Sequence, residues 1–290
     1  MPDQETVTSE QLTTAVDDIL KIKPDYASVL ELNRKIFIAQ EQSRARTRIE
    51  KIVIPEDILN IKLKEKFPLI NLSEFKIDTD EAARLFSDIC DTLKKENNEI
   101  TEAVAILARA AEDKKIDFGS LFDALLAENE SCFETTAGEL KVDKDILGFL
   151  IYSSVKPSLN VCAAGLSDYL DTNKEWDRGV CPICGSPPAL SVFENEGKRF
   201  FYCSFCWHKW RTQRIFCHNC GNKEHNTLRY FSFEDEEEHR VDICDKCNNY
   251  IKTVDCRNIN RFMYPPLEYL ATSHLDEKMT EMGFTSNVRS

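Results

Sequence analysis

Long apolar runs are missing from this chain of 290 residues. A helix that crosses a bilayer needs roughly 18 or more mostly apolar residues in succession. No run approaches that length, so the sequence predicts no membrane span. The amino terminus, MPDQETVTSEQLTT, is polar and acidic, which is not the composition of a secretory signal or a transit peptide. We therefore expect a cytoplasmic protein.

Positive charge is also scarce, with 37 Lys and Arg residues against 50 Asp and Glu residues and a net charge of −13. Because lysine and arginine drive phosphate binding, this balance argues against a general affinity for nucleic acid. The exception is the stretch from Lys198 to Arg214, where basic residues alternate with aromatic ones. Such a stretch could stack and hold single-stranded nucleic acid, or it could form the two faces of a small β-ribbon. We favour the ribbon.

The first part of the chain, to about residue 175, shows no catalytic constellation, and its apolar residues recur at helical steps of three and four. The sequence therefore predicts an all-α domain. Expected helices begin at Ser9, after Pro24, at Thr79 or Asp80 and at Asp143, and span 100–111, 118–127 and 160–170. Pro157 should stop or kink the helix that begins at Asp143.

The pattern changes at Lys174, after which short β-rich runs alternate with cysteine pairs. Residues 189–194 and 199–202 flank the turn sequence Asn-Glu-Gly, which predicts a hairpin. Residues 227–233 and 240–243 predict a second hairpin around the acidic turn at 234–238. The last part, 266–282, has a helical pattern. We predict an α+β protein with a helical domain at 1–174, two metal-binding modules at 175–258 (175–212 and 213–258), and a closing helical segment at 259–290.

Nine of the twelve cysteines are crowded between Cys181 and Cys256. In a reducing cytoplasm such crowding indicates metal binding or redox chemistry rather than disulfides. Eight of the nine form four C-x-x-C pairs, and two such pairs joined by a hairpin complete a tetrahedral site. A glycine follows the first pair of each module, where a positive φ is often needed. The sequence predicts two sites, Cys181, Cys184, Cys203 and Cys206 in the first and Cys217, Cys220, Cys244 and Cys247 in the second.

Several alternatives stay open. The pairs could be redox dithiols without a metal, or the pairs could be interleaved between the sites. Four thiolates suit zinc and a single iron about equally well; zinc would be structural, whereas iron would form a one-electron, rubredoxin-like centre. Of the other cysteines, Cys256 could be a reserve ligand but is expected to be a plain loop or strand residue, and we expect small core residues at Cys90, Cys132 and Cys162. Four histidines near the sites are expected at the surface, namely His208, His218, His225 and His239.

The C-x-x-C pairs and the residues around them resemble the family of the formate dehydrogenase accessory protein FdhE. The resemblance is carried by W-x-x-G-x-C-P-x-C-G-S-x-P from Trp176 and C-S-x-C-x-x-x-W-x-x-x-R from Cys203. It continues in C-x-x-C-G from Cys217 and C-x-x-C-x-x-Y-x-K from Cys244. The family's closing helix usually carries a paired acidic motif, where this chain has Leu-Glu-Tyr around Glu268.

The resemblance implies more than the cysteine spacing does. Members of this family are cytoplasmic factors with a helical domain and two rubredoxin-like modules that are thought to bind iron. They are thought to act on the catalytic subunit of formate dehydrogenase before its export. We therefore expect a non-enzymatic maturation factor with two iron ions, each bound by four cysteines, zinc being possible, and a formate dehydrogenase subunit as partner. The alternatives are a nucleic-acid-binding zinc-ribbon protein and a rubredoxin-type electron carrier.

Overall fold

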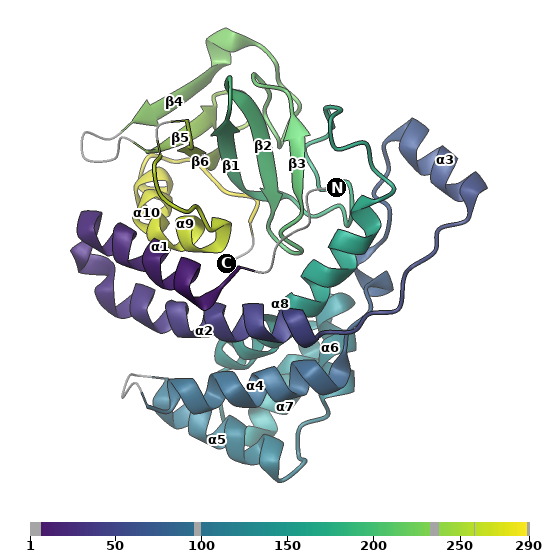
Figure 1. Ribbon diagram of the computed structural model, residues 1–290, viewed down its shortest axis with the longest axis vertical. Coiled ribbons are helices and arrows are strands. Elements are labelled where there is room, and N and C mark those ends of the chain that lie inside the picture. The colour runs from purple at the N-terminus through teal and green to yellow at the C-terminus, as the bar shows by residue number, and fades with distance from the viewer. Residues whose placement is uncertain (1–6, 96–99, 233–237, 258, 289–290) are drawn as a thin grey trace. The chain divides into compact units, whose positions relative to one another are not determined.

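The computed structural model describes residues 7–95, 100–232, 238–257 and 259–288 (Figure 1). Ten α-helices lie in these ranges: α1 Ser9–Ile22, α2 Ala27–Arg46, α3 Glu56–Glu65, α4 Thr79–Leu93, α5 Thr101–Glu112, α6 Phe118–Leu126, α7 Glu130–Leu140, α8 Lys144–Ser167, α9 Pro265–Ala271 and α10 Ser273–Glu281. Six strands follow α8: β1 Pro188–Glu194, β2 Lys198–Cys203, β3 Lys209–Thr212, β4 Leu228–Ser232, β5 His239–Cys244 and β6 Asn249–Asp255. The predicted order, a helical region, then strands with cysteine pairs, then closing helices, is confirmed.

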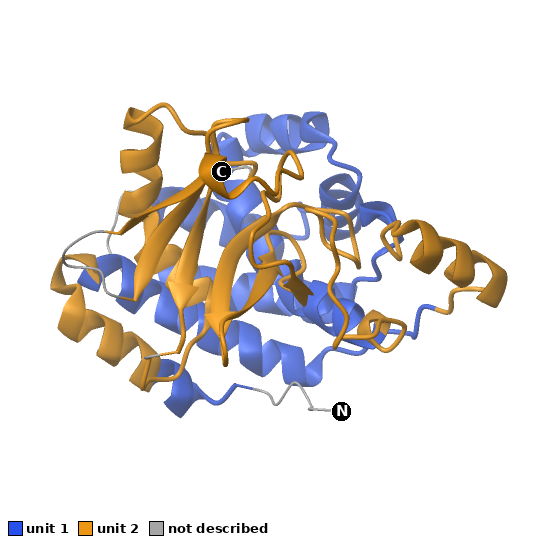
Figure 2. Ribbon diagram, turned by 90° about the horizontal axis from the view of Figure 1, so that it is seen from above, with its two compact units in different colours: residues 1–13, 27–52, 71–165 blue, residues 14–26, 53–70, 166–290 orange. Residues whose placement is uncertain are grey.

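The chain forms two compact units that interleave along the sequence (Figure 2). The first contains residues 1–13, 27–52 and 71–165, and the second contains residues 14–26, 53–70 and 166–290.

The first unit is helical. Its helix α4 shows how the sequence sets its shape, since Asp78 caps the amino end by accepting a hydrogen bond from the backbone N–H of Glu81. Apolar side chains at three- and four-residue steps then face the core, where Leu85, Phe86 and Ile89 are fully buried.

The sequence predicts that Pro157 stops or kinks its helix. It does not stop the helix, because α8 continues to Ser167. A proline has no N–H, so it leaves the carbonyl four residues earlier without its helical donor. That carbonyl belongs to Ser153, and it accepts a hydrogen bond from the side chain of Gln40 at 2.9 Å. The buried amide of Gln40 therefore replaces the missing backbone bond, and the predicted helices around 143–157 and 160–170 merge into one.

Among the described helices, only α8 is long and apolar enough to cross a bilayer. However, 67% of its most apolar window is buried inside the protein. Such burial is typical of the core helix of a soluble protein, so the length of α8 is weak support for a membrane span.

The second unit is built on a six-stranded sheet with the strand order β3-β2-β1-β6-β5-β4. The predicted hairpins are confirmed as the antiparallel pairs β1–β2 and β4–β5, although positions 233–237 of the second turn lie outside the described residues. Strands β3 and β6 were not predicted. Each module thus has three strands, and the parallel pairing of β1 with β6 joins the two modules into one sheet.

The closing helices lie against this sheet (Figure 1). Apolar side chains make the contact. Leu275 and Met279 of α10 lie in one cluster with Val241, Ile243 and Tyr250 of β5 and β6. A second cluster contains Leu190, Val192 and Val254 of the two central strands, with Cys256 half-buried against it.

Candidate metal centres

The first cysteine quartet lies where strands of the first module meet. Cys181 and Cys184 precede β1, Cys203 ends β2, and Cys206 lies in the turn before β3. Their four sulfurs lie within 4.8 Å of one another and all four residues are buried. Individual Sγ–Sγ distances are 3.8 Å for Cys181–Cys206, 3.5 Å for Cys184–Cys203 and 3.7 Å for Cys184–Cys206.

The second quartet has the same arrangement in the second module. Cys217 lies 3.6 Å from Cys247 and Cys220 lies 3.7 Å from Cys244, measured between the sulfurs. The four sulfurs again lie within 4.8 Å of one another, but Cys220 is exposed and Cys247 is only partly buried. The two quartets therefore differ in their access to solvent.

Both quartets fit the dimensions of a tetrahedral thiolate site. Four sulfurs at a metal–sulfur distance of about 2.3 Å lie about 3.8 Å apart, which is close to the distances of 3.5–3.8 Å. A disulfide would need about 2.0 Å, so the pairs are free thiols. The structure thus brings together the two sets of cysteines that the spacing grouped, and each set could hold a metal ion.

All four C-x-x-C turns share one backbone geometry. In each turn the residue after the second cysteine has a positive φ: Gly185 at 80°, Trp207 at 56°, Gly221 at 70° and Asn248 at 52°. The carbonyl of the first cysteine accepts from the N–H of that residue at Gly185 (2.9 Å), Gly221 (3.0 Å) and Asn248 (2.8 Å). The two glycines were expected, whereas the left-handed Trp207 and Asn248 could be found only by aligning the four pairs with one another.

Hydrogen-bond donors surround sulfurs of both quartets. The backbone N–H groups of Phe205 and Cys206 donate to Cys203 Sγ at 3.3 and 3.4 Å. In the second quartet, Asn222 Nδ2 donates to Cys244 Sγ at 3.5 Å. Donors of this kind stabilise the thiolate that a metal ion would bind.

Burial opposes ionisation of the same thiols. It raises the pKa of Cys181 and of Cys206 well above the ordinary value, whereas hydrogen bonds from the Cys181 and Cys203 thiols lower the pKa of Cys184. Burial is also the largest influence on Cys244, but donors from Asn222 and nearby backbone amides outweigh it and lower the pKa to about 7. Four adjacent thiolates repel one another, and a bound cation would remove that cost.

The first site is covered by a segment from far earlier in the chain. The backbone N–H groups of Leu69 and Ile70 donate to the carbonyls of Pro182 and Ile183, each at 2.9 Å. The segment lies against the first C-x-x-C turn, since a Cβ on Gly185 would lie 3.1 Å from the ring of Pro68. These contacts help to explain the complete burial of the first quartet.

The cysteines outside the quartets take no part in either group of four sulfurs. Cys90 and Cys162 are buried in the core, as expected, and burial raises the pKa of Cys90 to about 12. Cys132 is only partly buried. Cys256 donates its backbone N–H to the carbonyl of Phe193 at 2.9 Å, and its side chain is half-buried against the sheet.

The expectation that all four histidines lie at the surface is wrong for three of them. His208, His218 and His239 are buried, and only His225 is exposed. Burial lowers the pKa of His208 and of His218 to about 4, with Arg199 contributing at His218. Both rings are therefore uncharged at neutral pH and pack in the module core.

Glu268, which stands near the family's paired acids, is fully buried in an ion network. His239 Nε2 lies 3.0 Å from its carboxylate, and Arg261 bridges Glu268 to Glu238. Burial by itself raises the pKa of Glu268, but the hydrogen bonds from His239 and Arg261 outweigh it and leave the pKa below its ordinary value. In this chain Glu268 thus fastens α9 to the sheet.

The part of the chain that holds the first quartet is similar to a known family. Residues 180–214 match the family described as "FdhE, central domain". A "Protein FdhE homolog" from Aquifex aeolicus is 35% identical over 147 residues, covering 49% of this chain and 50% of the relative. Another from Edwardsiella ictaluri is 36% identical over 111 residues, covering 37% of this chain and 35% of the relative. The chain thus spans about half the length, or less, of the curated relatives it matches.

The likeness in fold is more extensive. The crystal structure of the FdhE protein from Pseudomonas aeruginosa matches with a TM-score of 0.67 and covers 98% of this chain and 96% of that chain. The sequence identity of that match is 18%, so it supports the fold. The resemblance predicted from the cysteine motifs is therefore confirmed: residues 180–214 match the FdhE central domain, and the whole chain has a fold similar to that of an FdhE protein.

Proposed function

We propose that this chain is a cytoplasmic, non-enzymatic maturation factor, a chaperone that binds the catalytic subunit of formate dehydrogenase before its assembly or export. The observation that carries the proposal is the match of residues 180–214, which hold the first cysteine quartet, to the FdhE central domain. The FdhE-like fold over 98% of the chain supports it. In this role the protein presents a surface to its client and holds that surface rigid.

Each quartet holds one metal ion in this proposal, iron by family resemblance or zinc by the same donor chemistry. Zinc would stabilise the fold, whereas iron would also supply one-electron chemistry. The buried quartet is suited to a structural role. The second quartet, with Cys220 at the surface, is suited to exchange of electrons or metal with a partner.

Capture from cell extracts tests the partner. Tagged protein should retain the catalytic subunit of formate dehydrogenase from cells that make this enzyme, and Cys203→Ser should weaken the capture because the first module loses its shape. Cys256→Ser is the matched control, since it removes a thiol that lies outside both quartets. Deletion of the gene should abolish formate dehydrogenase activity and leave the transcript intact. Normal activity in the deletion strain, with no paralogue present, would refute the proposal.

A rubredoxin-type electron carrier is the second candidate, and the exposure of Cys220 favours it. Protein isolated without air should then be red when oxidised, since ferric tetrathiolate iron is coloured and zinc is not. A carrier should bleach and recolour reversibly with a reductant and an oxidant, and Cys220→Ser should remove the part of the signal that changes fastest. Colourless protein containing two zinc ions would exclude this candidate.

A further inference from the structure

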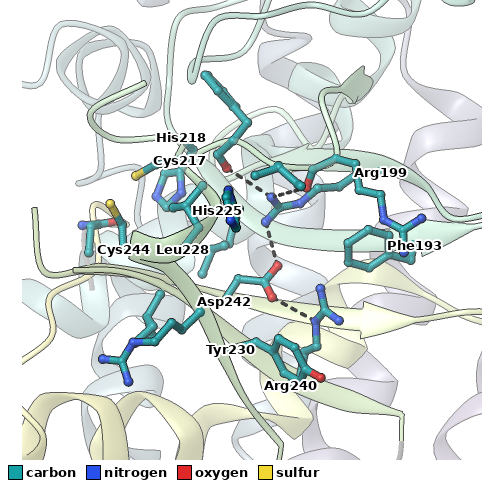
Figure 3. A pocket seen from close by; sticks show the side chains of 17 residues that line it. Phe193, Arg199, Cys217, His218, His225, Leu228, Tyr230, Arg240, Asp242 and Cys244 are labelled. Carbon is teal, nitrogen blue, oxygen red and sulfur yellow. Dashed lines mark hydrogen bonds and ion pairs between the residues drawn. The ribbon is translucent and has the colours of Figure 1, made fainter. Parts of the chain in front are cut away.

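A cavity of about 240 Å³ lies in the second unit beside the second cysteine quartet (Figure 3). Cys217 and Cys244 of that quartet line one side of it. Strands β1, β2, β4, β5 and β6 and the chain at 214–218 supply most of the remaining wall.

The lining is basic, although the whole chain carries a net charge of −13. Its charged residues are four arginines and one aspartate: Arg199, Arg214, Arg229, Arg240 and Asp242. Asp242 offsets one of these positive charges, and Asp245, outside the lining, offsets that of Arg229 through a bidentate pair at 2.6 and 2.7 Å. Among the arginine and aspartate side chains alone, two positive charges are therefore left over, and the thiolates of Cys217 and Cys244 add negative charge on the side of the quartet.

Three of the four guanidinium groups have a carboxylate partner, and two of them, Arg199 and Arg229, are fully committed to protein partners. Arg199 is buried, donates to Asp242 Oδ2 at 2.8 Å and donates to the carbonyls of Arg214 and Phe216 at 3.3 and 3.1 Å. Its contacts hold the sheet and the loop at 214–216 together. Arg229 is held by Asp245. Neither arginine can turn to a ligand without losing a protein partner.

Arg240 and Arg214 are placed to receive a ligand. The guanidinium of Arg240 lies 4.6 Å from the ring centres of both Phe193 and Tyr230, and its Nε lies 2.9 Å from Asp242 Oδ1. The guanidinium of Arg214 lies 5.8 Å from the centre of the Phe193 ring. Among the residues that the structure describes, no acidic side chain pairs with Arg214. Contact with the aromatic rings fixes these groups through their faces and leaves N–H edges for an oxyanion.

We propose that this cavity binds a phosphate group, either free or on a small phosphorylated molecule, between Arg214 and Arg240. A phosphate monoester carries about −1.5 to −2 charges at pH 7 and offers three acceptor oxygens, enough to accept from the N–H edges of both guanidinium groups. A carboxylate has two acceptor oxygens and a single charge, so it would bind the two guanidinium groups less tightly. The cavity is smaller than the roughly 300–1,000 Å³ of pockets for drug-sized ligands, so it suits a phosphate with a short attachment. This site is independent of the proposed function.

Titration calorimetry on the full, metal-loaded chain in a buffer free of phosphate tests the site. Inorganic phosphate and pyrophosphate represent the free anion, glycerol phosphate represents the small phosphorylated molecule, and acetate is the carboxylate probe. We expect saturable binding of at least one phosphate probe at one per chain, tighter than binding of acetate. Arg214→Gln and Arg240→Gln should each weaken it roughly tenfold, the loss expected for a charged hydrogen bond.

The matched control is Arg211→Gln, which removes the same charge from β3 at a residue that pairs with Glu175 and does not line the cavity. It should bind the phosphate probe as the native chain does. Metal content measured in each variant shows that the second module is folded, and Arg214 is exposed, so its replacement leaves the core intact. The proposal is overturned if no phosphate probe binds, if acetate binds as tightly, or if folded Arg214→Gln and Arg211→Gln bind alike.

Discussion

The burial and the pKa of single residues in this protein are set by tertiary contacts that the neighbouring sequence does not reveal. Lys156 is the clearest example. It lies within α8 and is only 6% exposed. Burial lowers its pKa from an ordinary 10.5 to about 8, although the nearby Glu41 acts in the opposite direction. The ammonium therefore costs stability at neutral pH, where both the folded and the unfolded chain keep it protonated.

Replacement of Lys156 by methionine should remove that cost. A shift from 10.5 to about 8 corresponds to roughly 3 kcal/mol, so Lys156→Met should raise the free energy of unfolding by up to about that amount at pH 7. Between pH 8 and 10.5 the unfolded chain binds the extra proton, so stability of the native protein rises with pH and the advantage of the variant shrinks. Glu41 keeps a partner in Arg44, whose Nε lies 2.9 Å away.

Urea unfolding of the two proteins at pH 7 and pH 10, followed by helix content, measures this difference. Lys115→Met is the control, because the Lys115 side chain is 64% exposed and should change stability little at either pH. A Lys156→Met variant less stable than the native protein at pH 7 would show that the lysine is held by a contact that outweighs its burial.

At the scale of elements, the sequence pattern predicted the hairpins, which depend on alternating residues and turns, but not the strands that depend on tertiary contacts. The hairpin of β1 and β2 follows from alternating apolar residues around a turn with Gly197 at a φ of 84°. Strand β6 was missed because its sequence, NYIKTVD, reads as polar, yet nearly all of it is buried. Lys252 can be buried there because Asp276 of α10 lies 2.6 Å from its ammonium, a contact that spacing along the chain cannot reveal.

The cysteine quartets were predictable for a different reason. Metal ligands of this kind come in C-x-x-C pairs whose separation is set by one hairpin. The spacing along the chain is therefore enough to predict which cysteines form each site. The burial of three histidines and the Glu268 network depend on tertiary contacts instead. The cavity beside the second quartet also could not be predicted from the sequence, because its arginines come from β2, β4, β5 and the loop at 214–216.

At Gly179 the chain passes so close to the backbone of the second module that a side chain has no room. A Cβ at this position would lie 1.6 Å from the carbonyl oxygen of His218, so the chain before the first quartet touches the backbone of the second. Gly179→Ala must displace one of these backbones. We expect a loss of stability of several kcal/mol, of the order seen for severe steric or strain mutants, together with weaker metal retention in the second quartet.

Thermal unfolding and metal analysis of Gly179→Ala test this contact. The control is Gly148→Ala in α8, where a Cβ would meet nothing within 4 Å. Alanine is the better helix former by up to about 1 kcal/mol, so the same substitution should stabilise the protein there. Equal stability of Gly179→Ala and the native chain would show that the contact with His218 is not maintained in solution.

At the scale of the molecule, the two metal modules are not separate ribbons. The parallel pair β1–β6 places all six strands in one sheet, and the ion pair of Arg199 with Asp242 links β2 to β5 at 2.8 Å. Loss of one quartet should therefore loosen the neighbouring module as well as its own. Each module has its own ligands along the chain, but the strand order shows that the two share a core.

The difference in exposure between the quartets leads to a final prediction about metal release. All four cysteines of the first quartet are buried, and the segment at 68–70 lies over its first turn. In the second, Cys220 is exposed. A chelator can attack the second ion directly, whereas release of the first requires local opening. Excess chelator should thus remove one ion per chain on the order of tenfold faster than the other, as measured by a coloured indicator. The fast phase should be absent in Cys220→Ser and the slow phase in Cys184→Ser; release of both native ions at one rate would contradict this difference between the sites.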